Sequence, residues 1–286
     1  MIQVARCSLR GHAKPSTLPI KLLLRKVNTS GIATHALPAI GLPRGGWSRS
    51  KRRGKNLRMS SPAALQPNSP HAWCYNAFVN HALLSLVPRE CRKVLDVGCG
   101  TGANAKAFRD RGGSVWGITC SEEEAKLASA FCDKVYLADL DIAVPSDLPD
   151  DLDLLFMSHV LEHLRRPAET LTKLCTRLRA GGYAAIAVPN MAYWPLRERL
   201  LKGDWHRTDE GAFDRTHLQF WSFETAPQVL QRTGLQLIAH TCEAVQTPFP
   251  LRSLLPNSVT ELIDRIQATR FANTFGWQTL LLAQKM

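Results

Sequence analysis

The chain of 286 residues contains no acidic residue before Glu90. Its first 58 residues hold 13 of the 36 lysines and arginines, and the rest of the chain is nearly neutral, with 23 basic and 24 acidic side chains. The formal net charge of +12 therefore belongs to the N-terminal segment. Because a basic surface is the footprint of nucleic-acid binding, we do not expect the remainder of the chain to bind nucleic acid.

Long apolar runs and paired cysteines are also absent. No stretch of 18 apolar residues occurs, which predicts no membrane span, and no apolar core follows the first basic residues, which excludes a secretory signal. None of the eight cysteines has the Cys-x-x-Cys spacing that is typical of zinc sites and redox pairs. We therefore expect free thiols in a reducing compartment, with the cytoplasm as the location.

Residues 1–60 are predicted to form a disordered basic tail, because they have scattered Pro and Gly, no sustained period and a basic cluster over 49–58. Three interpretations of this tail remain open: translated upstream sequence with Met59 as the true start, an organelle transit peptide, or a basic arm for a membrane or nucleic acid. Residues 61–286 are enough for one α/β domain with a full core.

Residues 94–102 (VLDVGCGTG) predict a buried strand over 93–97, a glycine-rich turn, and a helix from Ala103. The glycines allow positive φ and let a ligand approach the backbone, and the helix N-terminus directs N–H groups at the turn. This spacing also satisfies the loose dinucleotide fingerprint. Asp96 favours S-adenosylmethionine over a dinucleotide, because a carboxylate repels a pyrophosphate but attracts the ammonium and sulfonium groups of S-adenosylmethionine; a dinucleotide site or a purely structural turn remains the alternative for this stretch alone. The stretch resembles motif I of the class I S-adenosylmethionine (SAM)-dependent methyltransferases.

A second run carries the same resemblance independently: Glu162-His-Leu, then Pro167, a double glycine at 181–182 and Pro189-Asn190. It is similar to a bacterial group that includes ubiquinone O-methyltransferase-like and methionine-biosynthesis methyltransferase-like proteins. The resemblance implies SAM as the cofactor and an α/β fold: a Rossmann-like, seven-stranded, mostly parallel sheet with helices on both faces and a small helical lid insertion. In this family the last hairpin of the sheet inserts beside the fifth strand.

The resemblance also implies which residues hold the cofactor. Family members usually place an acid at the end of the second strand to accept the ribose hydroxyls, but Thr119 occupies that position here, as in cyclopropane-fatty-acid-synthase-like methyltransferases. The ribose contact is therefore expected from Thr119 or Glu122. Ser121 and the three glutamates that follow it have the spacing of a capping box that opens the next helix, so Glu123 and Glu124 are interpreted as helix capping. Asp139 would accept from the adenine amino group. The expected cofactor-binding set is Asp96, Gly98, Gly100, Gly102, Thr119, Asp139, Leu140 and Ser158.

Three histidines are candidate catalytic residues: His159, His163 and His217. The first two follow the strand expected over 152–157, at the sheet edge where the methyl group would lie, and a neutral imidazole there could remove a proton from a hydroxyl or an amine. Two alternatives remain open. The side chains could bond locally at a helix start, or His159, Glu162 and His163 could hold a metal, as in relatives with Glu-x-x-Glu-His. Our working hypothesis is a proton acceptor without a metal.

Residues 191–216 fall outside the expected sheet and resemble the lid of the same family. Within or beside this lid, Asp214 and His217 would either orient an acceptor or pin the lid to the core. The elements expected elsewhere are a helix over 71–87 with Phe78 buried, a helix over 225–233, a strand over 235–241, a helix from 257 with a buried stripe of Val259, Leu262 and Ile266, and a strand over 278–283.

The expected function is transfer of a methyl group from SAM to a small-molecule acceptor, or to a hydroxyl or amine linked to a lipid or sugar. A near-neutral domain without a membrane span fits such an acceptor better than a nucleic acid. The alternative is a catalytically weak methyltransferase-like protein that binds SAM and acts as a regulatory partner.

Overall fold

The computed structural model describes residues 78–244 and 254–286, which all lie within one compact unit, Ala63–Met286. Within these residues, none of the helices has both the length and the apolar surface that crossing a membrane requires.

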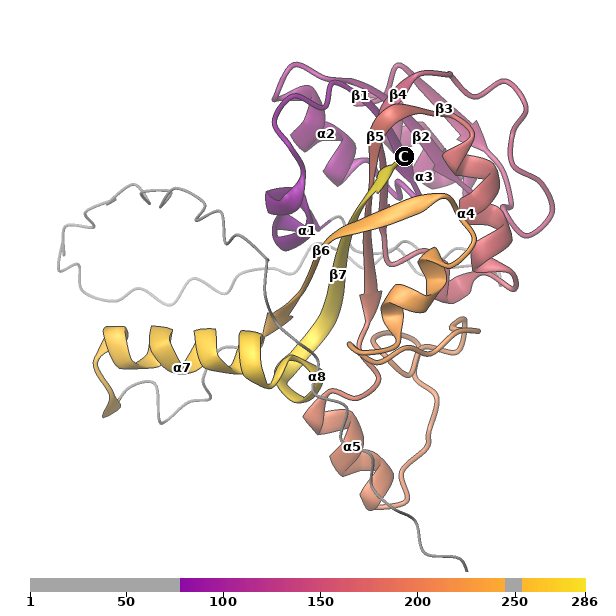
Figure 1. The fold of residues 1–286 in the computed structure, drawn as a ribbon. Coiled ribbons are helices and arrows are strands. Elements are labelled where there is room, and N and C mark those ends of the chain that lie inside the picture. The colour runs from indigo at the N-terminus through magenta and orange to yellow at the C-terminus, as the bar shows by residue number, and fades with distance from the viewer. Residues whose placement is uncertain (1–77, 245–253) are drawn as a thin grey trace, which may run out of the picture. The chain divides into compact units, whose positions relative to one another are not determined.

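Seven strands form one sheet in the order β3-β2-β1-β4-β5-β7-β6 (Figure 1). Strands β1 to β5 pair in parallel, and β7 lies antiparallel between β5 and β6. The Rossmann-like, seven-stranded, mostly parallel sheet expected from the sequence is therefore confirmed, including insertion of the last strand beside β5. The strands are β1 (Lys93–Val97), β2 (Ser114–Thr119), β3 (Lys134–Leu137), β4 (Leu152–Ser158), β5 (Leu178–Pro189), β6 (Leu235–Ala244) and β7 (Gly276–Lys285).

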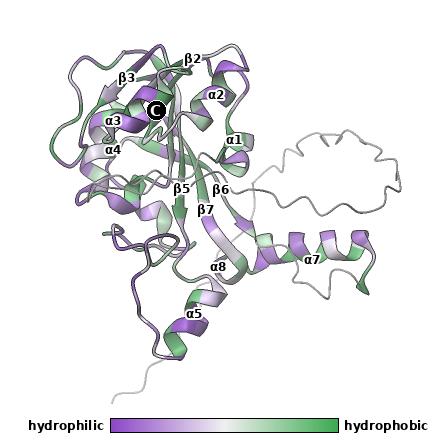
Figure 2. Ribbon diagram, turned by 180° about the vertical axis from the view of Figure 1, so that it is seen from behind, coloured by the Kyte–Doolittle hydropathy of each residue, from purple (hydrophilic) through white to green (hydrophobic). Residues whose placement is uncertain are grey.

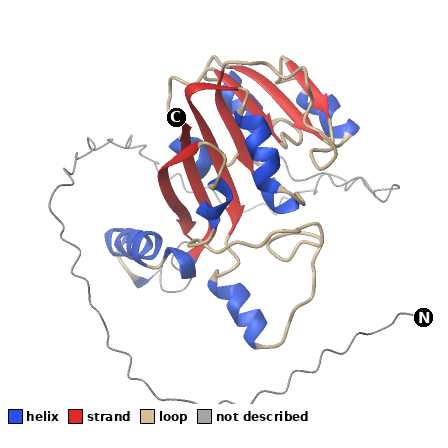
Figure 3. Ribbon diagram, turned by 45° about the vertical axis from the view of Figure 1, so that its right-hand side comes forward, coloured by secondary structure: helices blue, strands red, loops and turns tan. Residues whose placement is uncertain are grey.

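Helices cover both faces of the sheet (Figure 3). Because successive strand residues point to opposite faces, Leu155 and Phe156 of β4 enter different buried clusters. One cluster includes Leu171 of α4, and the other includes Phe108 of α2. The helices are α1 (His81–Leu86), α2 (Ala103–Arg109), α3 (Glu122–Ala128), α4 (Pro167–Cys175), α5 (Trp194–Leu201), α7 (Asn257–Arg270) and α8 (Ala272–Phe275), with 3-10 turns η1 (Leu161–His163) and η2 (Ala226–Leu230).

Two helices predicted from the sequence differ from the structure or lie only partly within the described residues. The helix predicted over 71–87 lies partly outside the described residues, and within them Phe78 is 78% exposed because it precedes the N-cap Asn80. The helix predicted over 225–233 is only the 3-10 turn η2. Arg232 has φ 64° and Gly234 has φ 76°, so left-handed residues end the segment before a second helical turn forms.

The apolar stripe predicted on α7 is not buried. Val259, Leu262 and Ile266 are 38%, 55% and 42% exposed, whereas Thr260 is 1% exposed. The helix projects beside the end of β6 in Figure 1, and Figure 2 shows both hydrophobic and hydrophilic residues along it. Amphipathic spacing predicted the helix correctly, but it could not show that only the face carrying Thr260 meets the body of the domain.

The parallel strands bring several expected site residues to one edge of the sheet. Residues that follow β1, β2, β3, β4 and β5 all lie at the carboxyl edge. The antiparallel β7 starts at the same edge, because Gln278 pairs with Pro189 and Glu243 of β6 pairs with Gln278. Residues that lie far apart in the sequence therefore meet here.

Asn190, directly after β5, connects several backbone segments through hydrogen bonds of its side chain. Its side chain is fully buried, and its Nδ2 donates to the carbonyls of Ala272, Asn273 and Gly276. Its Oδ1 accepts from the backbone N–H groups of Ala192 and Phe223. The amide therefore ties the start of the segment after β5, at Ala192, and the returning chain at Phe223 to α8 and β7.

Replacing Asn190 with Ala is expected to lower the free energy of unfolding by about 3 kcal/mol, because buried backbone donors and acceptors lose their partners. Urea unfolding measures this directly. Asn273→Ala is the control, since the Oδ1 of Asn273 has no partner in the described part of the chain, and it should cost less than about 1 kcal/mol. Equal losses in the two variants would contradict the role assigned to Asn190.

Candidate functional site

The turn after β1 has the backbone that the sequence predicted. Gly98, Gly100 and Gly102 have φ of 71°, 52° and 89°. A Cβ added at Gly98 would lie 2.5 Å from Cγ2 of Val160, whereas a Cβ at Gly100 would meet nothing within 4 Å. Gly98 is therefore required by packing within the protein, and Gly100 borders open space where a ligand can approach the backbone.

Asp96 is a buried acid without a charged partner or a side-chain partner in the described structure. It is 1% exposed, and neither carboxylate oxygen has a hydrogen-bond partner in the described structure. Burial raises the pKa of Asp96 to about 7, although the backbone N–H of Ala105 opposes the shift. Because an unpaired buried carboxylate is costly, this site fits a ligand that carries positive charge.

At the end of β2, Thr119 and Glu124 form a buried pair. The Oγ1 of Thr119 donates to Oε2 of Glu124 over 2.7 Å, and the Oε1 of Glu124 has no partner among the described residues. The expected cap of α3 is present, since the Glu124 N–H donates to Oγ of Ser121. The interpretation of the Glu124 side chain as capping alone is wrong, because the helix turns it toward β2 while Glu122 faces solvent.

The loop after β3 holds the two expected adenine contacts. Asp139 is exposed, and its Oδ1 accepts the N–H of Asp141 over 2.9 Å. Asp141 in turn accepts the N–H of Arg165 over 2.8 Å, which joins this loop to the segment after β4. Leu140 packs against the buried cluster below. The turn leaves the second carboxylate oxygen of Asp139 at the sheet edge.

Ser158 belongs to a polar network that the sequence did not indicate. The Nδ2 of Asn80 donates to Ser158 Oγ and to Gln278 Oε1, each over 3.0 Å, and Gln278 donates to a carboxylate oxygen of Glu243. The backbone N–H of Asn80 also donates to Oδ1 of Asn104 in α2. The one sequence signal for this network is Gln278, a glutamine near the start of β7 that comes shortly before the apolar run 280–283.

His159 has left-handed backbone geometry, with φ 58°, which is uncommon for a residue with a side chain. Its Nδ1 lies 3.1 Å from Oε1 of Glu162 and its Nε2 lies 2.8 Å from Oε1 of Gln278. The ring stacks on Trp277 with centroids 5.8 Å apart. Since Gln278 directs its amide N–H at the Glu243 carboxylate, its oxygen faces His159.

Both ring nitrogens of His159 therefore face acceptors. Burial by itself lowers the pKa of this imidazole, but the hydrogen bond and charge of Glu162, with smaller contributions from Gln278 and Glu243, raise it above its ordinary value. This geometry favours an imidazolium that donates twice and does not favour an acceptor of protons.

The other two candidate histidines meet between η1 and the chain around 216–218. His163 Nδ1 lies 2.9 Å from Oγ1 of Thr216, and burial lowers the pKa of His163. His217 Nδ1 donates to the carbonyl of Ala212 over 3.1 Å, and the two rings meet edge to face at 4.8 Å. The N–H of Leu218 donates to the Glu162 carbonyl. This contact supports the interpretation of the segment as pinned to the core.

The metal alternative involves a different set of donors from the one expected. Among the described residues, Glu162, His163 and His217 each offer one ligand atom, and these atoms lie within 4.8 Å of one another. Glu162 is fully buried, and its Oε2 has no partner there. His159 is not part of this set, because its nitrogens bond to Glu162 and Gln278.

Comparison with known proteins shows which family has this fold and glycine-rich turn. The family model of the methyltransferase domain matches residues 67–240. The chain belongs to this family. With its seven-stranded sheet and glycine-rich turn, it is a member of the class I SAM-dependent methyltransferases. The orphaned carboxylate of Asp96 and the open space at Gly100 fit that cofactor, which carries an ammonium, a sulfonium and no phosphate.

The chain is 26% identical over 153 residues to the bifunctional methionine biosynthesis protein MetXA/MetW of Rhodopirellula baltica, covering 46% of this chain and 24% of that protein. It is 30% identical over 112 residues to the ubiquinone biosynthesis O-methyltransferase of Paracidovorax citrulli, covering 37% of this chain and 47% of that protein. The chain thus spans less than half the length of these two relatives. A SAM-dependent methyltransferase structure from Archaeoglobus fulgidus is 22% identical with a TM-score of 0.50, covers 72% of this chain and 92% of that one, and supports the fold.

Proposed function

We propose that this methyltransferase transfers a methyl group from SAM to a hydroxyl or amine on a small molecule, or on a group linked to a lipid or sugar. The buried, unpaired carboxylate of Asp96 beside the open face of Gly100 is the observation that carries this proposal. The ubiquinone biosynthesis O-methyltransferase relatives support a hydroxyl acceptor. The cysteines of the described residues are all free, which supports a cytoplasmic location.

Each cofactor-binding residue has a physical task in this proposal. SAM supplies an activated methyl group when it is bound. Asp96 would pair with the ammonium, and the turn of Gly98, Gly100 and Gly102 would let the backbone approach. The unpaired Oε1 of Glu124, oriented by Thr119, would accept the ribose hydroxyls. The exposed oxygen of Asp139 would accept the adenine amino group, and Leu140 would pack on the ring. These residues hold and align the reactants, which lowers the entropic part of the barrier.

We assign His159 a positioning role in place of the proton acceptor that the sequence suggested. Its two donated hydrogen bonds join β4, η1 and β7 at the edge where the acceptor would enter. His163, whose pKa burial lowers, is the imidazole that stays neutral near pH 7 and is able to take a proton. His217 would hold His163 in place from the segment after the lid. In the alternative function, the same fold binds SAM without turnover and acts on a partner.

The pKa of His159 makes its role testable through pH. A histidine whose folded pKa is raised stabilises the fold fully below its unfolded pKa, and this stabilisation is lost as pH rises through the folded pKa. His159→Gln should therefore lower the free energy of unfolding more at pH 6 than at pH 9, as measured by urea unfolding. His81→Gln, at the exposed start of α1, is the control. A loss that is the same at both pH values would contradict the imidazolium assignment.

Glu124 gives a test of the ribose contact. Glu124→Gln should weaken SAM binding by roughly tenfold, about 1.4 kcal/mol, because an amide is a weaker acceptor for two hydroxyls than a carboxylate. Glu123→Gln, one residue away and exposed, should leave the affinity unchanged. Titration calorimetry of both folded variants measures the difference. If Glu122→Gln weakens binding and Glu124→Gln does not, Glu122, one of the two residues expected from the sequence, makes the contact instead.

The proposed function itself is tested by two measurements on the purified chain. Calorimetry should detect SAM and S-adenosylhomocysteine binding, and a screen of phenols, alcohols and amines should find acceptor-dependent production of S-adenosylhomocysteine. Binding without any acceptor-dependent turnover would favour the regulatory alternative. Failure to bind either molecule, in a folded protein, would overturn both.

A further inference from the structure

Gly117 lies inside β2, where a glycine weakens a strand because it has no side chain to pack. Its neighbours in the sheet are Asp96 of β1 and Val135 of β3. A Cβ at Gly117 would lie 2.7 Å from the Sγ of Cys99 and 3.1 Å from the Sγ of Cys132. The missing side chain therefore makes room for two sulfur atoms that meet at one point against the sheet.

The two thiols belong to segments that are far apart in the sequence. Cys99 lies in the glycine-rich turn after β1, and Cys132 lies between α3 and β3. Cys99 is 4% exposed, Cys132 is half-buried, and both are free. They share a hydrogen bond, which raises the pKa of the Cys99 thiol above its ordinary value together with burial and the nearby charge of Asp96. The pair is therefore a dithiol whose sulfur atoms are in contact.

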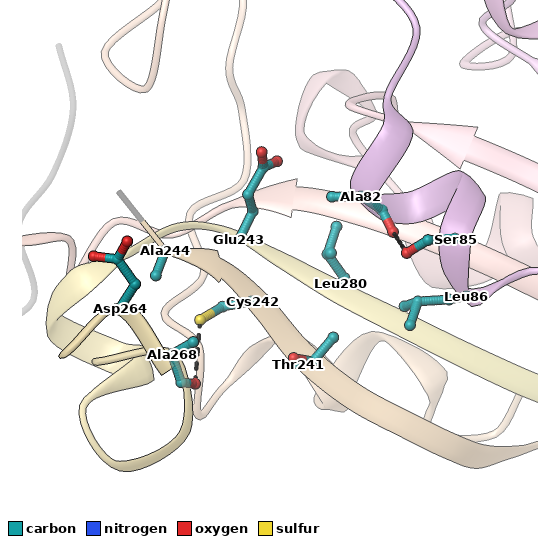
Figure 4. A pocket seen from close by; sticks show the side chains of 10 residues that line it. All are labelled: Ala82, Ser85, Leu86, Thr241, Cys242, Glu243, Ala244, Asp264, Ala268 and Leu280. Carbon is teal, nitrogen blue, oxygen red and sulfur yellow. Dashed lines mark hydrogen bonds between the residues drawn. The ribbon is translucent and has the colours of Figure 1, made fainter. Parts of the chain in front are cut away.

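Cys242 of β6 shows how a buried thiol is arranged when it has no such neighbour (Figure 4). Its Sγ donates to the carbonyl of Ala268 in α7 over 3.5 Å, as the dashed line in Figure 4 shows. No second cysteine is among the described residues that line the hollow around it. A single thiol of this kind packs as a small apolar group, whereas two thiols in contact can be oxidised to a disulfide.

The thiol of Cys99 is connected to the turn that faces the cofactor. Its sulfur lies 3.8 Å from the carbonyl oxygen of Gly100. Further along the turn, a Cβ at Gly102 would lie 3.0 Å from the Cα of Ala128 in α3. A disulfide holds its sulfurs about 2.05 Å apart, much closer than two thiols in contact. Because the turn already touches α3, drawing Cys99 toward Cys132 must shift the backbone beside Gly100.

We propose that Cys99 and Cys132 form a redox-sensitive dithiol site, which a small-molecule disulfide such as oxidised glutathione converts to a protein disulfide that weakens SAM binding. Cys132 is the more exposed thiol and reacts first. It loses its proton to water, and its thiolate forms a mixed disulfide while one glutathione thiolate leaves. Cys99 then loses its proton and attacks the Cys132 sulfur, and the second glutathione leaves. The two protein thiols are oxidised by two electrons, and glutathione disulfide is reduced to two thiols.

The first test maps the cross-link in the full chain after incubation with reduced and oxidised glutathione. Trypsin cuts after lysine and arginine, so it places Cys99 in peptide 94–106, Cys120 in peptide 112–126 and Cys132 in peptide 127–134. Once the remaining free thiols are alkylated, mass spectrometry should find peptides 94–106 and 127–134 joined, and dithiothreitol should separate them. Absence of this joined pair, or joining of either peptide mainly to 112–126, would overturn the site.

The second test measures SAM affinity by calorimetry in the reduced and oxidised protein. Oxidation should weaken SAM binding by roughly tenfold or more, and dithiothreitol should restore it. In Cys132→Ser the affinity should equal that of the reduced parent and should not respond to oxidation. Cys120→Ser, which removes an exposed thiol at the end of β2, is the control and should behave as the parent does.

The coupling must also act in the reverse direction, because linkage between two equilibria is reciprocal. At a fixed concentration of reduced glutathione, saturating SAM should raise the concentration of oxidised glutathione that gives half-maximal cross-linking, by the same factor as oxidation weakens SAM binding. A mapped cross-link that changes neither the SAM affinity nor this midpoint would show that the dithiol is not coupled to the cofactor turn.

Discussion

Asp96→Asn is expected to weaken SAM binding by roughly 100-fold at pH 8, equal to about 2.8 kcal/mol. The amide keeps the shape of the side chain but removes the one buried charge at the turn. A cationic ligand then loses its counter-ion in a place where the carboxylate has no competing partner. Asp110→Asn, at the exposed end of α2, is the control and should not change the affinity.

The same carboxyl should make binding depend on pH. With a pKa of about 7, Asp96 is protonated in the free protein at lower pH, so a cationic ligand must displace a proton to bind. Affinity should therefore fall as pH drops below 7, by up to about tenfold per pH unit. Calorimetry at pH 5.5 and pH 8, in buffers of different ionisation enthalpy, should detect the released proton. In Asp96→Asn the affinity should be flat over this range.

The unliganded protein should show the opposite trend in stability. The folded pKa of Asp96 lies above its ordinary value of 3.8, so the folded state binds more protons than the unfolded state between about pH 4 and pH 7. The contribution of Asp96 to stability therefore decreases as pH rises through this window and is constant above it. A SAM affinity that is the same in parent and Asn variant at pH 8 would contradict the assignment of this turn.

The parts of the fold that the sequence predicted correctly depend on local signals. The strand and glycine turn around Asp96 were identified by an apolar run and three glycines, and the structure has the same bounds and the expected positive φ. Ser121 was identified as the N-cap of α3 from its spacing to Glu124. The order of strands at the C-terminal end followed from the family resemblance, because periodicity alone does not assign the partners of a strand.

The parts that were missed depend on contacts between distant residues. Asn80 and Gln278 are 198 positions apart and meet only because β7 runs antiparallel to β5. His217 reaches His163 and Glu162 only after the lid has returned the chain. Glu124 was assigned to capping because spacing identifies a helix start but does not show which side of the helix meets the sheet. The exposed stripe of α7 was misjudged for the same reason.

Gly100→Ala should weaken SAM binding at least tenfold while costing only about 1–2 kcal/mol of stability. The added methyl group meets no protein atom within 4 Å, so it occupies the space into which the cofactor would enter. The stability cost arises because an alanine at φ 52° is strained. Calorimetry gives the affinity, and urea unfolding gives the stability.

Two further glycine-to-alanine variants distinguish the effect of backbone strain from the effect of a lost ligand contact. Gly203 has φ 74° and open space around its Cβ position but lies in the lid, so Gly203→Ala should lose similar stability and keep the affinity for SAM. Gly98→Ala brings its Cβ against Val160 and should lose more stability than either. If Gly203→Ala weakens SAM binding as much as Gly100→Ala does, backbone strain alone explains the loss, and the open space beside Gly100 is not where the cofactor binds.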